Sequence, residues 1–243
     1  MKISQAMVLA AGLGTRMRPI TDTIPKPLVR VAGKTLVDYA LDHLQQAGVE
    51  TAVVNIHHFP EQMLAHLAGR DQPRILISDE RDGLMNNGGG LAKGIKHLAP
   101  GPLLVMNADL FWIGEPTDQP TNLQRLGDAF NAARMDMLML CVTLEQTTGH
   151  NGENDFNLGA DGRLTRYQPG DPNPVVYAGA LAMEHSLLDD APDDAFNLNI
   201  YFDRAIAKGR LFGLMLEGQW LTVGTPEAID EAETVLARHS KDT

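Results

Sequence analysis

The strongest constraint on this chain is an apolar run near the N-terminus that breaks into a glycine-rich, basic loop. Residues 7–19 read MVLAAGLGTRMRP, and a lysine between two prolines follows as Pro25-Lys26-Pro27. Glycines let the backbone turn tightly and leave amide N–H groups free to face phosphate oxygens, while Arg16 and Lys26 supply positive charge. The segment therefore predicts a backbone cradle for polyphosphate at the end of a buried strand.

Two well-known phosphate loops do not fit this segment. No Lys-Ser or Lys-Thr pair directly follows Gly12 and Gly14 as in a Walker loop, and the third glycine of the Rossmann fingerprint is missing. A dinucleotide-dependent oxidoreductase would also need an acidic residue about 20 positions further on, after the second strand, and none is in place. By themselves, Gly12 and Gly14 favour an ordinary strand-to-loop turn. The charged residues and the Pro-Lys-Pro segment beside them favour a phosphate site.

Length and charge limit the classes of protein to which the chain can belong. Its 243 residues suffice for one sizeable α/β domain with its own core. The net charge of −11 lacks the basic character of proteins that bind nucleic acid or anionic membranes. Positive groups nevertheless gather near the N-terminus, which favours a local site for a small anion. These groups are Arg16, Arg18, Lys26 and Arg30.

The single cysteine and the absence of long apolar stretches predict the compartment. Cys141 lies inside the apolar run at residues 137–144, where it reads as a core side chain, and it has no partner for an intrachain disulfide. The N-terminus shows no signal-type apolar segment, and no stretch approaches the roughly 18 apolar residues of a membrane span. We expect a cytoplasmic protein, a monomer or homodimer, without nucleic-acid or membrane partners.

Apolar periodicity divides the chain into alternating strands and helices. Residues 3–10 and 51–56 have the apolar runs of buried strands, and residues 35–47 carry apolar side chains at helical spacing before Gly48. This alternation predicts a mainly parallel sheet covered by helices on both faces. We expect further strands at 74–78, 102–106, 136–144, 175–183, 211–216 and 219–223, further helices at 60–67, 91–98, 122–134, 198–208 and 226–237, and a hairpin of 154–158 with 163–167.

Two further segments bring polar groups to the predicted carboxyl edge of the sheet. Asn86 and Asn87 precede three consecutive glycines at a predicted helix start, where free backbone groups suit the edge of a planar base or a phosphate. A flexible hinge is the alternative. Asp109 follows a predicted buried strand and is either an N-cap or a ligand for Mg²⁺, which prefers hard oxygen ligands. His57 and His58 fit a loop better than a metal pair, because adjacent strand residues point to opposite faces.

The N-terminal segment resembles the signature of the sugar-1-phosphate nucleotidyltransferases. The shared residues are Leu-Ala-Ala-Gly-x-Gly-Thr-Arg-x-x-Pro at residues 9–19 and Pro-Lys-Pro at residues 25–27. The resemblance covers nearly the whole chain, whose length is similar to that of the short bacterial members. It implies a single Rossmann-like, GT-A-like three-layer α/β domain, with residues 1–110 as the nucleotide-binding part and residues 145–183 as a small sugar-binding insertion.

The resemblance implies a reaction and a role for individual residues. An NTP and a sugar 1-phosphate would give an NDP-sugar and pyrophosphate, with positioning and charge neutralisation supplying most of the catalysis. Arg16 would hold the β- and γ-phosphates, and Lys26 would stabilise the α-phosphate. Asp109 would bind Mg²⁺, with Thr222 as a second candidate ligand. The implied nucleotide-binding residues are Leu9, Ala10, Ala11, Gly12, Gly14, Thr15, Asn87, Gly88 and Gly89.

The acceptor sugar is assigned mainly to the polar insertion. Amide groups and tight glycine turns in this region suit sugar hydroxyls. Asn199 lies on the predicted helix at 198–208, where a solvated face is the alternative to a sugar contact. The complete sugar-binding set is Asn107, Asn154, Asp155, Gly179 and Asn199.

The chain departs from the family's pattern in four places. Thr222 stands where many members have a metal-binding Asp, and a hydroxyl is a poorer ligand for Mg²⁺ than a carboxylate. Asn86 and Asn87 replace the common Glu and Thr before the glycines, which bears on the base. Gln168 replaces a lysine that contacts the sugar phosphate, so that Arg163 or Arg166 would have to substitute for it. The fourth change, Ala108 for Gly, is small.

Three hypotheses about function follow. The first is uridylyl transfer from UTP to an amino-sugar 1-phosphate such as N-acetylmuramate 1-phosphate, with Mg²⁺. The second is guanylyl transfer to mannose 1-phosphate. The third is a nucleotide-sugar-binding regulator that kept the phosphate cradle and lost catalysis, which is motivated by Thr222 and Gln168.

Overall fold

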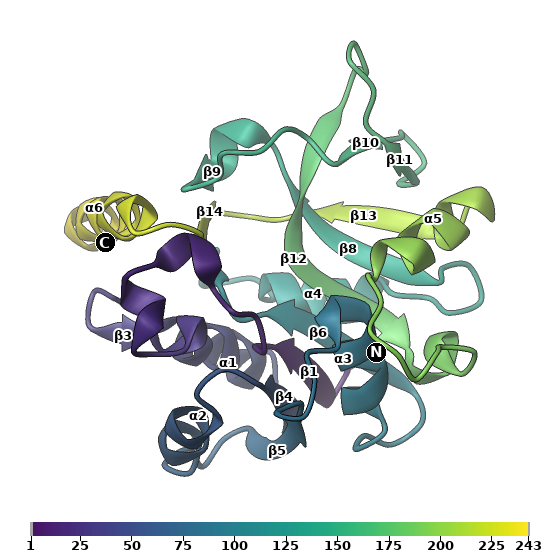
Figure 1. The fold of residues 1–243 in the computed structure, drawn as a ribbon. Coiled ribbons are helices and arrows are strands. Elements are labelled where there is room, and N and C mark those ends of the chain that lie inside the picture. The colour runs from purple at the N-terminus through teal and green to yellow at the C-terminus, as the bar shows by residue number, and fades with distance from the viewer. Residues whose placement is uncertain (1, 243) are drawn as a thin grey trace.

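A computed structural model describes residues 2–242 and shows a mixed central sheet with helices on both of its faces (Figure 1). The strands of this sheet are β1 (Gln5–Leu9), β4 (Thr51–Ile56), β5 (Arg74–Asp79), β6 (Pro102–Asn107), β8 (Met137–Val142), β10 (Phe156–Leu158), β11 (Leu164–Arg166), β12 (Pro174–Glu184) and β13 (Leu211–Met215). Their order is β11-β10-β12-β6-β1-β4-β5, while β8 pairs with β12 and β13. Strands β6, β1, β4 and β5 are mutually parallel, and β12 is antiparallel to its neighbours β6 and β8. The predicted three-layer α/β class is confirmed.

Apart from the helix predicted at 91–98, the helices lie close to the predicted ranges, with two differences at their ends. They are α1 (Leu36–Gln46), α2 (Pro60–Leu67), α3 (Asn86–Ile95), α4 (Asn122–Ala129), α5 (Asn199–Ala207) and α6 (Glu227–Asp242). The predicted helix at 122–134 ends early because Phe130 adopts an extended conformation after α4. Helix α6 continues beyond the predicted end at residue 237.

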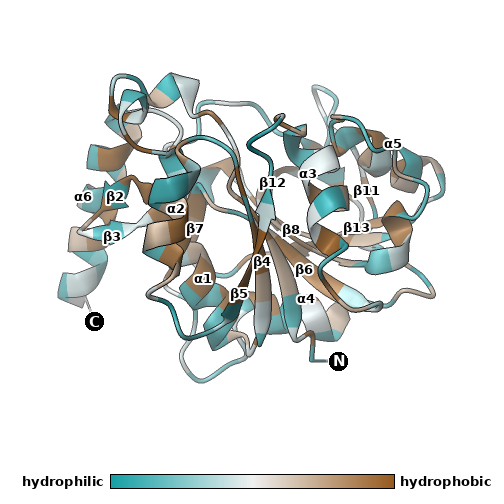
Figure 2. Ribbon diagram, turned by 60° about the horizontal axis from the view of Figure 1, so that its bottom comes forward, coloured by the Kyte–Doolittle hydropathy of each residue, from teal (hydrophilic) through white to brown (hydrophobic). Residues whose placement is uncertain are grey.

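Two separate apolar cores explain why the parallel strands are apolar on both faces. Val8 and Val54 belong to one core together with Leu41 of α1. The alternate residues Met7 and Val53 belong to the other core, which includes side chains of α3. Successive strand residues point to opposite sides, so the continuous apolar runs supply both cores at once. Figure 2 shows the apolar colouring along the interior strands and the polar colouring on the surrounding loops.

Helix α3 begins at Asn86 and includes the glycine triplet, which corrects the predicted start at residue 91. Gly88 has no room for a side chain, since an added Cβ would lie 2.4 Å from a ring carbon of Phe196. At Gly89 an added Cβ would lie 2.9 Å from the carbonyl oxygen of Asp194. Glycine is a poor helix former, and this close packing explains why the helix nevertheless starts here.

A second, three-stranded sheet brings the C-terminal part of the chain to the N-terminal loop. It consists of β7 (Leu110–Ile113), β14 (Gln219–Thr222) and β9 (Thr147–Thr148), in the order β7-β14-β9. The sequence pattern does not predict β7. In this sheet Thr222 pairs with Leu110, the residue after Asp109. Helix α6 packs nearby and its Glu233 accepts the backbone N–H of Ala32 at 2.8 Å. Within residues 2–242, no helix has both the length and the apolar character that crossing a membrane requires.

We expect the folding stability to decrease as the pH decreases, because of the buried imidazole of His43. His43 of α1 stacks on Trp112 with ring centroids 4.2 Å apart, and Nδ1 lies 3.8 Å from a carboxylate oxygen of Glu115. Burial, helped by the positive charge of Lys34, lowers the pKa of His43 to about 4. The unfolded state, with an ordinary pKa near 6.5, therefore binds more protons between pH 6.5 and 4, and folding stability is lost as the pH falls through this window.

The size of this effect can be measured by denaturant unfolding at two pH values. The shift predicts a loss of about 2 kcal/mol between pH 7 and pH 5 from His43 alone. His43→Phe keeps a ring against Trp112 but cannot titrate. Between pH 7 and pH 5 the variant should therefore lose about 2 kcal/mol less stability than wild type. An equal pH dependence for wild type and variant would show that His43 is not the responsible group.

Candidate functional site

A cavity of about 280 Å³ lies where the carboxyl ends of β1, β4 and β6 meet. In open α/β sheets this edge is the usual place for a ligand. The cavity is lined by residues from distant parts of the chain, and eight of the predicted site residues are among them. The lining residues are Leu9, Ala10, Ala11, Gly12, Lys26, Pro27, Asn55, Leu84, Asn86, Asn87, Asn107, Ala108 and Asp109.

The two glycines of the N-terminal loop serve different purposes. Gly14 has φ +63°, and an added Cβ would lie 2.9 Å from both Lys26 Cβ and Thr21 Cγ2. The hydroxyl of Thr21 also donates to the Gly14 carbonyl at 2.8 Å. Gly14 thus lets the loop turn closely against the segment that carries Lys26. Gly12 lines the cavity, and an added Cβ there would meet nothing within 4 Å. It leaves room for a ligand against the backbone.

This difference yields a prediction for two alanine variants. Gly12→Ala should keep the wild-type melting temperature but weaken nucleotide binding by about tenfold, because the new methyl group occupies ligand space. Gly14→Ala should lower stability by about 1–3 kcal/mol through the left-handed backbone and the close contacts. Gly69→Ala, on an exposed turn with its nearest Cβ neighbour at 3.8 Å, is the matched control. Unchanged nucleotide affinity in Gly12→Ala would contradict the assigned role.

An ion pair joins the two charged residues of the cavity. Lys26 Nζ lies 2.5 Å from Asp109 Oδ2, and Lys26 is only 9% exposed. Its backbone forms a 3₁₀ turn, Lys26–Leu28, that starts after the extended Pro25. Asp109 follows β6, and its carbonyl accepts the N–H of Val223 at 3.0 Å. The structure therefore brings together Lys26 and Asp109, as the sequence predicts, and adds the chain segment after Thr222.

Arg16, on the glycine loop, lies close to the chain segment that follows Thr222. It belongs to the 3₁₀ turn Thr15–Met17, and its guanidinium nitrogens lie 3.7 Å from the position that a Cβ on Gly224 would take. Gly224 comes two residues after Thr222, at the end of β14. Lys26 therefore lines the cavity, whereas Arg16 does not line it and lies beside Gly224.

The single carboxylate of the cavity limits the kind of metal site that it could form. Among the lining residues in the described part of the chain, Asp109 carries the one carboxylate, and residues 2–242 contain no group of three or more His, Cys, Asp or Glu side chains that could hold a metal ion. A metal site of protein ligands alone is therefore not formed by these residues. Mg²⁺ commonly binds through one or two carboxylates and substrate phosphates, so Asp109 fits a magnesium ion that arrives with a polyphosphate.

The backbone N–H groups of Gly88 and Gly89, which were predicted to be free for a nucleotide, have partners within the protein. The N–H groups of Gly88 and Gly89 both donate to the carbonyl of Phe196, at 3.0 and 3.2 Å, so they are not free for a base or phosphate. Neither glycine lines the cavity, whereas Asn86 and Asn87 do. The Asn87 side chain accepts the N–H of Leu198 at 2.9 Å. Contacts to the nucleotide from this segment would therefore come from the two asparagines.

The predicted sugar-binding residues separate into two groups. Asn107 lines the cavity, and Gly179 of β12 lies beside it, since an added Cβ on Gly179 would be 3.3 Å from Asn107 Nδ2. Asp155 Oδ2 instead accepts the N–H of Tyr177 at 2.9 Å. Asn154 lines another cavity, next to Leu144 and Met215, and Asn199 Oδ1 accepts from Arg166 at 2.9 Å. The structure does not bring Asp155, Asn154 or Asn199 to the lining of the cavity at the sheet edge.

Both candidate substitutes for the missing lysine have other partners. Arg163 pairs with Asp161 and donates to the carbonyl of Gly209. Arg166 pairs with Asp203 at 2.9 Å and lies over the ring of Phe156. Each side chain is held next to β13 or α5 in this structure.

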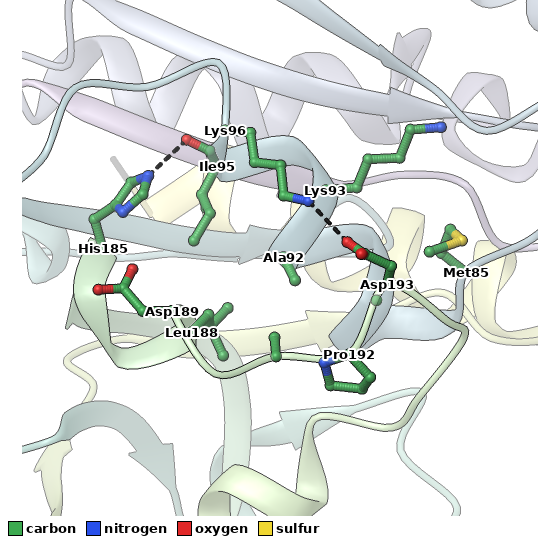
Figure 3. A pocket seen from close by; sticks show the side chains of 12 residues that line it. Met85, Ala92, Lys93, Ile95, Lys96, His185, Leu188, Asp189, Pro192 and Asp193 are labelled. Atoms are coloured by element: carbon green, nitrogen blue, oxygen red, sulfur yellow. Dashed lines mark hydrogen bonds and ion pairs between the residues drawn. The ribbon is translucent and has the colours of Figure 1, made fainter.

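A larger cavity of about 610 Å³ lies on the outer side of α3, against the segment around His185–Leu188 (Figure 3). Its charged side chains are largely occupied with one another or with the backbone. Lys96 pairs with Asp193 at 3.1 Å, and His185 Nε2 lies 3.0 Å from the carbonyl of Ile95. Only Gly89 of the predicted site residues lines this cavity. The smaller cavity at the sheet edge is therefore the candidate functional site.

Sequence reasoning missed two buried polar residues near this site. Asn55 of β4 lines the cavity at 2% exposure, and Glu80, directly after β5, is fully buried. The available signal was a polar residue at the carboxyl end of an otherwise apolar strand, where the parallel sheet places its ligands.

Comparisons with known proteins agree with this geometry. Residues 6–189 match the family model of the MobA-like NTP transferase domain. N-acetylmuramate alpha-1-phosphate uridylyltransferase of Caulobacter vibrioides is 41% identical over 236 residues, which cover 96% of each chain. The enzyme of the same name from Neisseria meningitidis serogroup B is 30% identical over 235 residues, 95% of this chain and 97% of that protein. A UDP-glucose pyrophosphorylase crystallised with UDP-glucose has the same fold, with a TM-score of 0.76 at 19% identity, over 98% of this chain and 99% of that one.

Proposed function

The chain belongs to the MobA-like NTP transferase family, and from this membership we propose that it transfers a uridylyl group from UTP to N-acetylmuramate 1-phosphate. The products would be the UDP-sugar and pyrophosphate. The observation that carries the proposal is the 41% identity with a uridylyltransferase of that specificity over 96% of both chains. The cavity with Lys26, Asp109 and the glycine loop supports it.

The residues of the cavity suit a direct displacement at phosphorus. An oxygen of the sugar phosphate attacks the α-phosphorus, the bond to the bridging oxygen of the β-phosphate breaks, and pyrophosphate leaves with the electron pair. The attacking phosphate oxygen carries no proton at neutral pH, so the reaction needs no general base. The transition state concentrates negative charge, and fixed positive groups and N–H donors lower its energy.

Individual side chains have distinct tasks in this proposal. Lys26 donates to the α-phosphate, and Arg16 with the loop amides after Ala10 holds the β- and γ-phosphates. Mg²⁺ bound with the nucleotide would neutralise phosphate charge, and Asp109 would hold it from the protein side, with Thr222 next to it across β7 and β14. Asn107, which lines the cavity, would contact the acceptor sugar, and Gly179 lies next to Asn107.

The test is pyrophosphate release with Mg²⁺ across a grid of substrates. UTP, GTP, dTTP, CTP and ATP are each combined with the 1-phosphates of N-acetylmuramate, N-acetylglucosamine, glucose and mannose. We expect UTP with N-acetylmuramate 1-phosphate to exceed every other pair in kcat/KM. A clear preference for GTP with mannose 1-phosphate would establish the guanylyl alternative. No release from any pair, with nucleotide binding retained, would favour the regulator that lost catalysis.

A further inference from the structure

A buried chain of hydrogen bonds joins the two walls of the nucleotide cavity. Asn55 Oδ1 accepts the N–H of Ala10 at 2.6 Å, and Asn55 Nδ2 donates to Glu80 Oε1 at 2.6 Å. Glu80 Oε2 in turn accepts the N–H of Met85 at 3.1 Å. Asn55 is 2% exposed and Glu80 is 0% exposed. We call this series, from Ala10 through Asn55 and Glu80 to Met85, the wall bridge.

The wall bridge fixes segments that come from distant parts of the chain. Ala10 starts the glycine-loop wall that continues through Gly12, whereas Met85 leads into the wall formed by Asn86 and Asn87. The separation of these walls is set by two side chains that are closed off from water. A change in either side chain would therefore alter the width of the cavity.

The third glycine of α3 is explained by the same bridge. An added Cβ on Gly90 would lie 2.6 Å from Glu80 Oε1 and 2.7 Å from Asn55 Nδ2. Any larger residue would press the two side chains apart. Glu80 also lies beside the first turns of α3, where the positive end of the helix favours a negative group.

Only one assignment of donors and acceptors satisfies all three hydrogen bonds of the wall bridge. Glu80 must accept twice, once from Asn55 and once from Met85. Asn55 must accept from Ala10 with its oxygen and donate to Glu80 with its nitrogen. A buried donor that faces another donor loses both hydrogen bonds at once, which is costly away from water.

We propose that Asn55 and Glu80 are positioning residues that set the width of the nucleotide cavity, so that affinity for the nucleotide depends on their complementary hydrogen bonds. The inference rests on the proposed function, because it takes the cavity at the sheet edge to bind the NTP. Neither residue is required to touch the reacting phosphates.

The proposal is tested by exchanging the amide and the carboxylate between positions 55 and 80. In Glu80→Gln one amide donor faces a donor of Asn55 or Met85, and in Asn55→Asp two carboxylates face each other. Each single change should weaken binding of UTP with Mg²⁺, measured by calorimetry without a sugar phosphate, by about tenfold or more. The double variant N55D/E80Q restores the pattern, since the new Asp accepts from Ala10 and from the new Gln, which accepts from Met85. Its affinity should return to within about threefold of wild type.

Two glycine variants separate cavity width from general stability. Gly90→Ala should weaken UTP binding, because the new Cβ disrupts the wall bridge without removing a polar group. Gly94→Ala is the control on the same helix. Its Cβ would meet the flexible end of Met7, 2.4 Å from the sulfur, on the core side of α3. It should lower the melting temperature but leave UTP affinity unchanged.

The outcomes distinguish this inference from the proposed function. Wild-type affinity for UTP in both single variants would overturn the wall bridge, and so would a folded double variant that still binds UTP weakly. If a single variant does not fold, recovery of both folding and UTP binding in the double variant supports the bridge. Wild-type protein that binds GTP but not UTP contradicts uridylyl transfer, and the same variants are then titrated with GTP. If wild type binds neither nucleotide, both proposals fail.

Discussion

Lys26→Met is expected to lower kcat for nucleotidyl transfer by at least about a thousandfold while the protein remains folded. Lys26 is the buried cation of the cavity, and its ammonium group lies 2.5 Å from Asp109 Oδ2. Transfer of a nucleotidyl group builds up negative charge around the α-phosphorus, and a fixed ammonium group in a partly buried site stabilises this charge strongly. Methionine keeps the apolar stem of the lysine and removes only the charge.

The stability of this variant should change little. Asp109 loses its partner, but its side chain is 35% exposed and can be hydrated. A melting curve and a single-turnover assay of pyrophosphate release, both on the purified variant, separate folding from chemistry. Lys96→Met, on the outer side of α3 and paired with Asp193, is the matched control and should keep wild-type activity. Turnover of Lys26→Met within tenfold of wild type would refute the role given to Lys26.

The elements with a local apolar pattern were predicted most accurately. The ranges 51–56 and 60–67 coincide with β4 and α2. Strand β7 was missed, because it has only four residues and is defined by its pairing with β14, far along the chain. The start of α3 was missed for a related reason, since its glycines contact Phe196 and Asp194, and helix propensity carries no information about such tertiary contacts.

The site was predicted where residues follow strand ends and less well elsewhere. Leu9, Asn107 and Asp109 line one cavity because the parallel strands β1 and β6 place their carboxyl ends at one edge of the sheet. A glycine indicates that something approaches closely but not which group approaches, and at Gly88 that group is Phe196. Among the predicted sugar-binding residues, Asp155 is one whose contacts the sequence does not show. Its carboxylate accepts a backbone N–H from β12, a pairing that depends on how the insertion folds over the sheet.

The remaining large effect concerns the carboxylate of the cavity. Asp109→Asn is expected to lower kcat by about a hundredfold or more and to raise the Mg²⁺ concentration for half-maximal rate. The amide keeps the shape and one oxygen of the carboxylate but has no negative charge, and it holds Mg²⁺ weakly. It also removes the charge partner of Lys26, so the lysine is freer to meet a phosphate. Nucleotide affinity measured without Mg²⁺ should therefore not fall.

The metal dependence is the readout that separates a ligand from a structural residue. Rates are measured for wild type, Asp109→Asn and Asp109→Glu over a range of Mg²⁺ concentrations, with Asp193→Asn on the outer side of α3 as the matched control. Asp109→Glu retains the charge and should need less Mg²⁺ than Asp109→Asn. If Asp109→Asn loses activity at every Mg²⁺ concentration with an unchanged half-maximal value, Asp109 acts by positioning Lys26 through their ion pair and not by holding the metal.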